Sequence, residues 1–154
     1  MNLIYVPLTR GLYAVIDAAD AEAVLPFKWT AQVAKQTYYA YRFLYGNGRR
    51  RKVYLHRLLM GDPLLQVDHI NGDGLDCRRA NMRLATPAQN RHNTRRPNRL
   101  GFTGIYAQRG GRFTARIHDG RRRISLGTFD TPHEAGAAYA AAAAERYGEF
   151  SPCS

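Results

Sequence analysis

The sequence has 154 residues, enough for one medium domain or two small ones. Its hydrophobic content of 45% is sufficient for a globular core and excludes wholesale disorder. There are 23 lysine and arginine residues against 12 aspartate and glutamate residues, a formal net charge of +11, which predicts a polyanionic partner. The alternatives are a basic protein without such a partner and a membrane-surface protein. The second is disfavoured because no basic amphipathic helix with bulky apolar residues is present.

The two cysteines, Cys77 and Cys153, form no CxxC pair, so a structural zinc site is not expected. Reduced thiols are the simpler interpretation, although a disulfide between the two stays open. No stretch reaches the roughly 18 apolar residues of a membrane span, and the N-terminus lacks a secretion signal pattern. These features predict a cytoplasmic protein without a membrane partner.

The first 60 residues predict short strands and two short helices. Turn residues separate alternating and aromatic runs, and Pro26 and Gly61 mark helix ends. Trp29 is expected in the core, because the aromatic residues here lie beside aliphatic ones. A basic run at 49–52 follows a turn, is interpreted as an exposed hairpin tip, and favours phosphate contact. The expected strands are 3–8, 12–16, 27–29, 37–44 and a short strand that begins at residue 53. One helix is expected within 17–26, and a second follows the strand at 53 and ends at residue 60.

Residues 65–93 carry the most specific pattern. A short apolar run ends in Asp68 and His69, and Asn-Gly and Asp-Gly turns follow. A second apolar run at 82–85 leads to a helix start with Thr86 as N-cap and Pro87 at the first helical position. A strand, a turn, a strand and a helix are therefore expected in this order.

This order of elements can bring together two acidic or basic side chains and two amides: Asp68, His69, Asn81 and Asn90. The residue types suit a hydrolytic metal site, because a carboxylate and an amide oxygen bind a hard cation. A histidine transfers protons, and another amide can orient it. Asp73 and Asp76 are expected to form turns through their own backbone.

Several separate pieces of this stretch resemble the HNH endonucleases of the homing type found in phages and mobile elements. The matching pieces are Asp68-His69-Ile70-Asn71-Gly72-Asp73, Asn81-Met82-Arg83-Leu84 and Gln89-Asn90, with Leu55-His56-Arg57 upstream. The resemblance covers about residues 50–95 and implies a ββα-metal motif that binds one divalent ion. It implies that His69 is the general base that activates water and that Asn81 orients it.

The same resemblance implies that Asp68 and Asn90 are the metal ligands. Many members of the family have a histidine at the position of Asn90, and the oxygen donor here favours Mg²⁺ or Mn²⁺. His56 is either a buried structural histidine or a residue that supports the site without binding the ion. His92 is a possible phosphate contact or supporting residue, because it points about 200° away from Asn90 on the predicted helix.

A basic, turn-rich segment follows and is the predicted boundary between domains at 1–95 and 102–154, with a linker at 96–101. Arg95, Arg96 and Arg99 are expected to contact phosphates. The second domain predicts strands at 104–108, 113–118 and 123–129, then a helix capped by Thr131 and ended by Gly148. The whole chain is therefore predicted to be α+β.

The second domain resembles the AP2 DNA-binding domain. The matching residues are Gly104-Ile105, Phe113-Thr114-Ala115-Arg116-Ile117, Leu126-Gly127-Thr128-Phe129, Glu134-Ala135 and Ala138-Tyr139. The resemblance implies a three-stranded antiparallel sheet with one helix, and a sheet face that enters the major groove. By position, the residues that face DNA are Tyr106, Gln108, Arg112, Arg116, His118, Arg123 and Ser125. Arg116 and Arg123 have the geometry to bind guanine through two hydrogen bonds.

The sequence thus predicts a site-specific double-stranded DNA endonuclease of the HNH homing type, which hydrolyses phosphodiester bonds with one Mg²⁺ or Mn²⁺ ion. A monomer is favoured, because the chain holds one active site. The alternative is a DNA-binding regulator whose HNH unit is inactive. An RNA-binding protein is less favoured, because no RNP-type motif is present.

Overall fold

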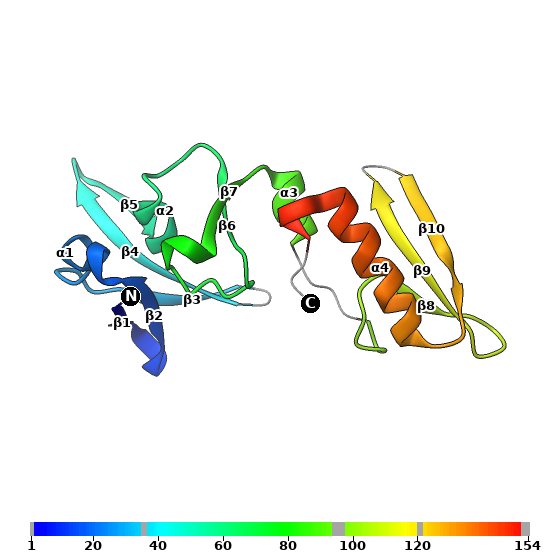
Figure 1. The fold of residues 1–154 in the computed structure, drawn as a ribbon. Coiled ribbons are helices and arrows are strands. Elements are labelled where there is room, and N and C mark those ends of the chain that lie inside the picture. Colours follow the sequence, from blue (N-terminus) through cyan, green and yellow to red (C-terminus); the bar gives the residue numbers. More distant parts are fainter. Residues whose placement is uncertain (1, 35–36, 94–97, 120–121, 152–154) are drawn as a thin grey trace. The chain divides into compact units, whose positions relative to one another are not determined.

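The computed structural model describes residues 2–34, 37–93, 98–119 and 122–151, without the side chain of His92. The chain divides into two compact units, Met1–Ala88 (unit 1) and Gln89–Ser154 (unit 2). Both contain small antiparallel sheets and short helices, so the predicted α+β class is confirmed (Figure 1). The division lies earlier in the chain than the predicted domain boundary at 95.

Unit 1 contains three small antiparallel sheets. They are the β1–β2 hairpin, the three-stranded sheet β3–β4–β5, and the β6–β7 hairpin. The strands are β1 (Leu3–Pro7), β2 (Tyr13–Asp17), β3 (Thr30–Val33), β4 (Tyr38–Gly46), β5 (Arg49–Tyr54), β6 (Gln66–His69) and β7 (Met82–Ala85). The helices are α1 (Ala21–Val24) and α2 (Leu55–Leu59), with 3₁₀ turns η1 (Thr9–Gly11), η2 (Ala18–Asp20) and η3 (Arg79–Asn81).

Two local predictions for unit 1 were wrong in detail. The basic run 49–52 is not a hairpin tip but lies within β5, because Asn47 and Gly48 make the turn with φ angles of 50° and 68°. Such Asn-Gly turns match the twist of the flanking strands. Residues 27–29 form no strand, although Trp29 makes an isolated bridge with Leu8.

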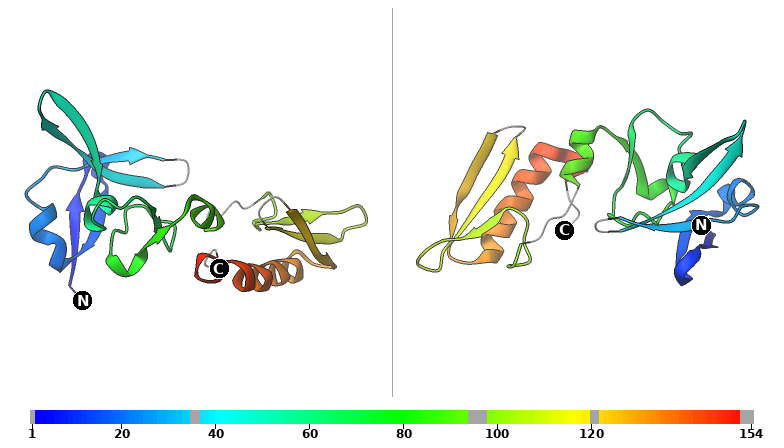
Figure 2. Two further views of the ribbon diagram at one scale, coloured as in Figure 1. Left: turned by 90° about the horizontal axis from the view of Figure 1, so that it is seen from above. Right: turned by 180° about the vertical axis from the view of Figure 1, so that it is seen from behind.

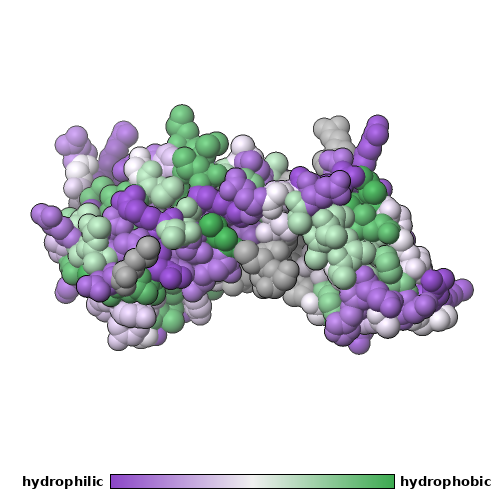
Figure 3. Space-filling model, viewed as in Figure 1, coloured by the Kyte–Doolittle hydropathy of each residue, from purple (hydrophilic) through white to green (hydrophobic). Residues whose placement is uncertain are grey.

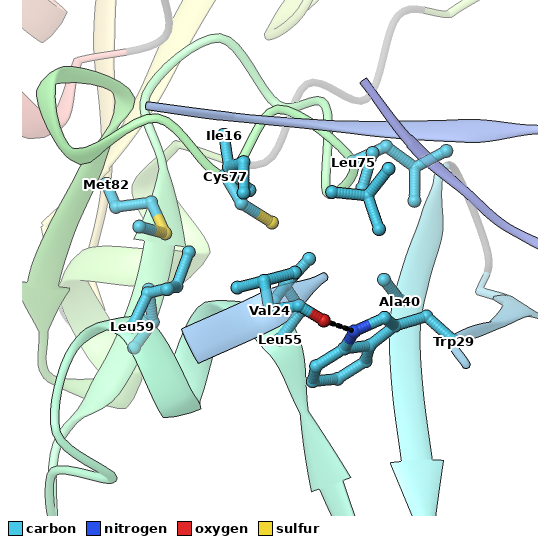
Figure 4. Close-up of a cluster of buried hydrophobic side chains, with 12 residues drawn as sticks. Ile16, Val24, Trp29, Ala40, Leu55, Leu59, Leu75, Cys77 and Met82 are labelled. Atoms are coloured by element: carbon cyan, nitrogen blue, oxygen red, sulfur yellow. Dashed lines mark hydrogen bonds between the residues drawn. The ribbon is translucent and has the colours of Figure 1, made fainter. Parts of the chain in front are cut away.

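The core of unit 1 packs the strands against α1 and α2 (Figure 4). Trp29 is only 3% exposed, as predicted for a core residue. Its indole Nε1 donates a hydrogen bond of 3.0 Å to the carbonyl of Val24, so the one polar atom of the ring is satisfied inside the core. Ile16, Leu55 and Cys77 are fully buried around it.

The helix α3 (Pro87–His92) contains the division between the two units. Beyond it, unit 2 has the strands β8 (Ile105–Ala107), β9 (Phe113–Asp119) and β10 (Arg122–Phe129), in the order β10–β9–β8. The helix α4 (Pro132–Tyr147) follows, and a 3₁₀ turn η4 (Gly148–Phe150) ends the described chain. The predicted three strands and helix are therefore present.

In unit 2, α4 packs across one face of the sheet, as both views in Figure 2 show. Ile105, Ala115 and Ala135 form the buried centre. The predicted helix start is confirmed: the Thr131 side chain accepts from the Glu134 backbone, and the Glu134 side chain accepts from the Thr131 backbone. Within the residues that the structure describes, no helix is long and apolar enough to cross a membrane.

Candidate active site

The β6–β7 hairpin places Asp68 and His69 side by side at the end of β6. In its antiparallel register Asp68 lies opposite Arg83, and His69 lies opposite Met82. Both side chains are buried, with exposed fractions of 4% for Asp68 and 5% for His69. Two ionisable groups in so little solvent require partners, and the structure provides them.

The carboxylate of Asp68 is paired with Arg83 inside the protein. Arg83 Nε and Nη2 both lie 2.8 Å from Asp68 Oδ2. The guanidinium compensates the buried charge and fixes the direction of the carboxylate. Sequence reasoning missed Arg83, although opposite charges facing each other across two strands are the signal that could have identified it.

Asn81 holds together the loop that connects β6 to β7. Its Nδ2 donates to Asn71 Oδ1 at 3.0 Å and to the carbonyl of Asp76 at 2.8 Å, and its Oδ1 accepts from the Asn71 backbone at 3.1 Å. The backbone of Ile70, directly after His69, donates to the Asn81 carbonyl at 2.8 Å. Asn81 therefore fixes the segment that carries His69.

Asp73 and Asp76 stabilise the same loop in different ways. Asp73 Oδ1 accepts from the Leu75 backbone at 3.0 Å, which is the predicted Asx turn. Asp76 does more, because it binds Asn71 Nδ2 at 2.9 Å and forms an ion pair with Arg78 at 2.5 Å. Hydrogen bonding from Arg78 lowers the pKa of Asp76. The loop also pairs with β2, because the Val15 backbone bonds to both Leu75 and Cys77 at 2.8 Å.

Aromatic side chains surround the His69 imidazole. The His56 ring lies 5.2 Å from the His69 ring, edge to face, and the Tyr39 ring lies 5.8 Å from it. Tyr54 stacks on His56, with 5.5 Å between the ring centres. His56 thus lies buried beside His69, which agrees with both interpretations of the sequence, a structural histidine or a supporting residue, and its role stays a prediction. Tyr39 was missed, because an aromatic residue in a strand carries no signal beyond that of a core residue.

Burial keeps both imidazoles neutral. It lowers the pKa of His69, an effect that the charges of Asp68, Asp73 and Asp76 oppose. Burial, with smaller contributions from His69 and Arg57, lowers the pKa of His56 to about 3. A neutral imidazole is the form that accepts a proton, so His69 has the protonation state of a general base at neutral pH.

The predicted ligand Asn90 lies in α3, in unit 2, and its role stays a prediction. Among the described residues, no three His, Cys, Asp or Glu side chains gather in a metal-binding group. Mg²⁺ and Mn²⁺ do not need such a group, since Mg²⁺ typically takes one or two carboxylates and keeps several waters. Asp68 is the carboxylate that the sequence predicts as a ligand, and this role, like that of Asn90, stays a prediction.

The sheet of unit 2 presents five of the ten predicted DNA contacts on the face opposite α4. In β9, Arg116 and His118 alternate with the buried Ala115 and Ile117. The register places Arg123 opposite His118, Ser125 opposite Arg116, and Tyr106 opposite Thr114. The Arg116 guanidinium lies 5.4 Å from the centre of the Tyr106 ring.

The other predicted DNA contacts are placed less uniformly. Arg112 forms an ion pair with Asp130 at 3.0 Å and also bonds to the Thr128 carbonyl. Gln108 and Arg99 are exposed in turns or loops. Arg95 and Arg96, and the His92 side chain, lie outside the described residues.

Residues 62–92 match the family model described as HNH endonuclease. The match is about a fifth of the chain and contains β6, the connecting loop, β7 and α3, with Asp68, His69, Asn81 and Asn90. It supports a nuclease that acts on DNA. A search of curated proteins found no match.

Proposed function

We propose that the protein is a site-specific DNA endonuclease of the HNH homing type. The observation that carries this proposal is the buried, neutral His69 beside Asp68, on a hairpin within the stretch that matches the HNH endonucleases. The favoured cofactor is a single Mg²⁺ or Mn²⁺ ion. The favoured substrate is double-stranded DNA inside a cell, and the favoured state is a monomer encoded by a phage or mobile element.

In the proposed reaction, His69 accepts a proton from the water that attacks the phosphorus atom. Asp68 and Asn90 would hold the divalent ion, which when bound stabilises negative charge on the phosphate and the leaving oxygen. Arg83 keeps the Asp68 carboxylate in one direction. Asn81 keeps the loop after His69 in one conformation, which maintains the direction of the imidazole.

Unit 2 is proposed to bind the duplex through the sheet face opposite α4, as in the AP2 domain. The arrangement of Tyr106, Arg116 and Arg123 on one face supports this role. On this view residues 1–95 cut DNA, the basic linker at 96–101 contacts phosphates, and residues 102–154 hold the target. The alternative function, a DNA-binding regulator with an inactive HNH unit, requires that duplex binding occur without cleavage.

The deciding experiment compares DNA cleavage by the wild type and by His69→Ala. The substrates are supercoiled plasmid and genomic DNA, which supplies unknown target sites, with Mg²⁺ or Mn²⁺. We expect the variant to lose cleavage and to keep its duplex affinity within a few-fold of the wild type, because His69 acts on the attacking water.

The matched control is His133→Ala, which removes an exposed imidazole from α4 and should leave cleavage unchanged. Cleavage by His69→Ala at the wild-type rate would show that another group is the base. Loss of DNA binding in this variant would contradict the assigned role. Tight duplex binding by the wild type without metal-dependent cleavage of either substrate would favour the regulator.

A further inference from the structure

One face of the β4–β5 hairpin in unit 1 combines aromatic and basic side chains. Side chains alternate between the two faces of a strand, and the register pairs Tyr41 with Tyr54, Phe43 with Lys52, and Tyr45 with Arg50. We call this surface the aromatic–basic face. It consists of Tyr39, Tyr41, Phe43 and Tyr45 from β4 and Arg50, Lys52 and Tyr54 from β5.

The rings of this face form a continuous row that ends at His69. Neighbouring ring centres are 6.4 Å apart for Tyr45 and Phe43, 5.5 Å for Phe43 and Tyr41, and 6.3 Å for Tyr41 and Tyr54. Tyr39 then lies 6.3 Å from Tyr54 and 5.8 Å from His69. The face therefore leads from the hairpin tip, where Tyr45 is 77% exposed, to the proposed general base.

Two cations are held above this row of rings. The Arg50 guanidinium lies 4.3 Å from the centre of the Phe43 ring, and the Lys52 ammonium lies 4.3 Å from the centre of the Tyr41 ring. Lys52 also donates to the Gln32 side-chain oxygen at 2.8 Å. The cation–π contacts and this hydrogen bond fix the positions of the two charges without neutralising them.

The opposite face of the same hairpin differs in its charge balance. There Arg51 forms an ion pair with Asp62 at 3.1 Å. In the described part of the chain, neither Arg50 nor Lys52 forms an ion pair with a carboxylate. Hydrophilic side chains project at the upper left of Figure 3, where Figure 1 shows the hairpin tip. Uncompensated, positioned cations at an exposed surface are complementary to a polyanion.

The spacing of the two cations fits a DNA backbone. Arg50 and Lys52 are two residues apart in β5, which corresponds to about 6.8 Å along an antiparallel strand. Because the backbone winds around the helix axis, neighbouring phosphates of one DNA strand lie farther apart than the axial rise of about 3.4 Å per nucleotide, at a distance comparable with this spacing. Two cations at this separation can contact two phosphates of the same backbone.

We propose that the aromatic–basic face binds the sugar–phosphate backbone of duplex DNA beside the bond presented to His69. Unit 1 would then hold the DNA itself, next to the point of cleavage, through contacts that are independent of base sequence. This inference rests on the proposed nuclease function. It adds a second DNA contact to the one proposed for unit 2.

The test compares two double variants with the same change in net charge. Arg50→Gln with Lys52→Gln removes the cations of the aromatic–basic face, and Arg49→Gln with Arg51→Gln removes two cations from the opposite face of the same strand. Duplex affinity is measured against salt concentration for several unrelated sequences, in the presence of a metal chelator so that no DNA is cut. Trp29 fluorescence verifies that unit 1 is folded in each variant.

We expect the first variant to reduce the slope of log affinity against log salt by about 1.8, since each phosphate contact contributes about 0.9. Its affinity for every duplex sequence in about 0.1 M salt should be at least roughly tenfold weaker than that of the wild type. The Arg49→Gln, Arg51→Gln variant should keep a slope close to that of the wild type. Equal slopes in the two variants, or an unchanged duplex affinity of the Arg50→Gln, Lys52→Gln variant, would overturn the proposal. Because no cleavage is measured, this result is separate from that of His69→Ala: binding can persist in a chain that does not cut.

Discussion

At the scale of single residues, the site depends on two imidazoles that the protein keeps uncharged. His56 and His69 contact each other edge to face, and Tyr39 lies against both rings. Protonating either ring would place a positive charge in a buried aromatic cluster without water to solvate it. The contact between the two rings therefore holds His69 in a neutral state and in one orientation, as its proposed role as the base requires.

This environment predicts that the stability of unit 1 depends on pH. The pKa of His56 is about 3 in the folded protein, against the ordinary histidine value of 6.5 that applies to the unfolded chain. Between these values the unfolded state binds the proton and the folded state does not, so the free energy of unfolding falls as pH is lowered. The contribution of His56 approaches about 1.4 kcal/mol per pH unit below pH 6 and sums to about 1.6 kcal/mol between pH 6.5 and 5.

Denaturant unfolding at a series of pH values, followed by Trp29 fluorescence, measures this dependence. Trp29 is the only tryptophan of the chain and lies in the core of unit 1. His56→Gln removes the titrating group. Below pH 6.5 it should reduce the slope of the free energy of unfolding against pH by up to about 1.4 kcal/mol per pH unit, the contribution of one proton. An unchanged slope would mean that folded His56 takes up its proton near the ordinary pKa. The lowered pKa of His69 acts in the same direction and remains in both proteins.

The residues that carry the proposed chemistry were predictable from the sequence, whereas their partners were not. Asp68, His69 and Asn81 stand at fixed distances in the chain, and the structure brings them to one hairpin and its loop. Arg83 and Tyr39 become neighbours of the site only through the strand register and the packing of separate sheets. Neither follows from the local order of residues.

At the scale of elements, the strongest local signals were reliable. The β6–β7 hairpin, the start of α3 at Pro87 and the capping box of α4 all occur where turn and cap residues predicted them. The weakest signal, the alanine-bearing stretch 17–26, gives only a 3₁₀ turn and the four-residue α1. So short a helix is not stable by itself and forms only because Val24 packs into the core.

Gly104 lies directly before β8 and against Tyr139 of α4 in unit 2, and its replacement should be strongly destabilising. Its φ is +74°, and a Cβ atom there would lie 2.4 Å from the Tyr139 ring and 2.6 Å from the Arg116 carbonyl. Gly101 has a similar φ of +80° but nothing within 4 Å of its Cβ position. Gly101→Ala should therefore cost about 1–2 kcal/mol for the left-handed backbone alone, and Gly104→Ala clearly more.

Thermal unfolding followed by the helical circular dichroism signal compares the two variants, since α4 is the longest helix described. Gly101→Ala introduces the backbone strain alone, whereas Gly104→Ala adds steric overlap with Tyr139, so the difference between the two variants measures the overlap. Equal destabilisation by the two substitutions would show that Tyr139 moves aside without cost. In that case the close approach of β8 to α4 would not be needed for the stability of unit 2.

At the scale of the whole molecule, the described residues form two hydrophobic clusters and carry the two surfaces proposed to bind DNA. The cluster around Trp29 belongs to unit 1, and the cluster around Ile105 belongs to unit 2. The net charge of +11 predicts a polyanionic partner, but the structure is needed to show that Arg50 and Lys52 form no ion pair with a carboxylate among the described residues.

The burial of Cys77 makes its thiol a probe of how often the loop between β6 and β7 opens. The thiol is fully buried, and burial, with the charges of Asp76 and Asp73, raises its pKa to about 12. Only a thiolate reacts with an alkylating reagent, so modification must wait until the loop opens. In a Cys153→Ser background, the labelling rate of Cys77 should thus report how often the loop leaves its folded conformation, and rapid labelling of the folded protein would contradict this. A divalent metal ion or duplex DNA that binds to this hairpin should lower the labelling rate of Cys77.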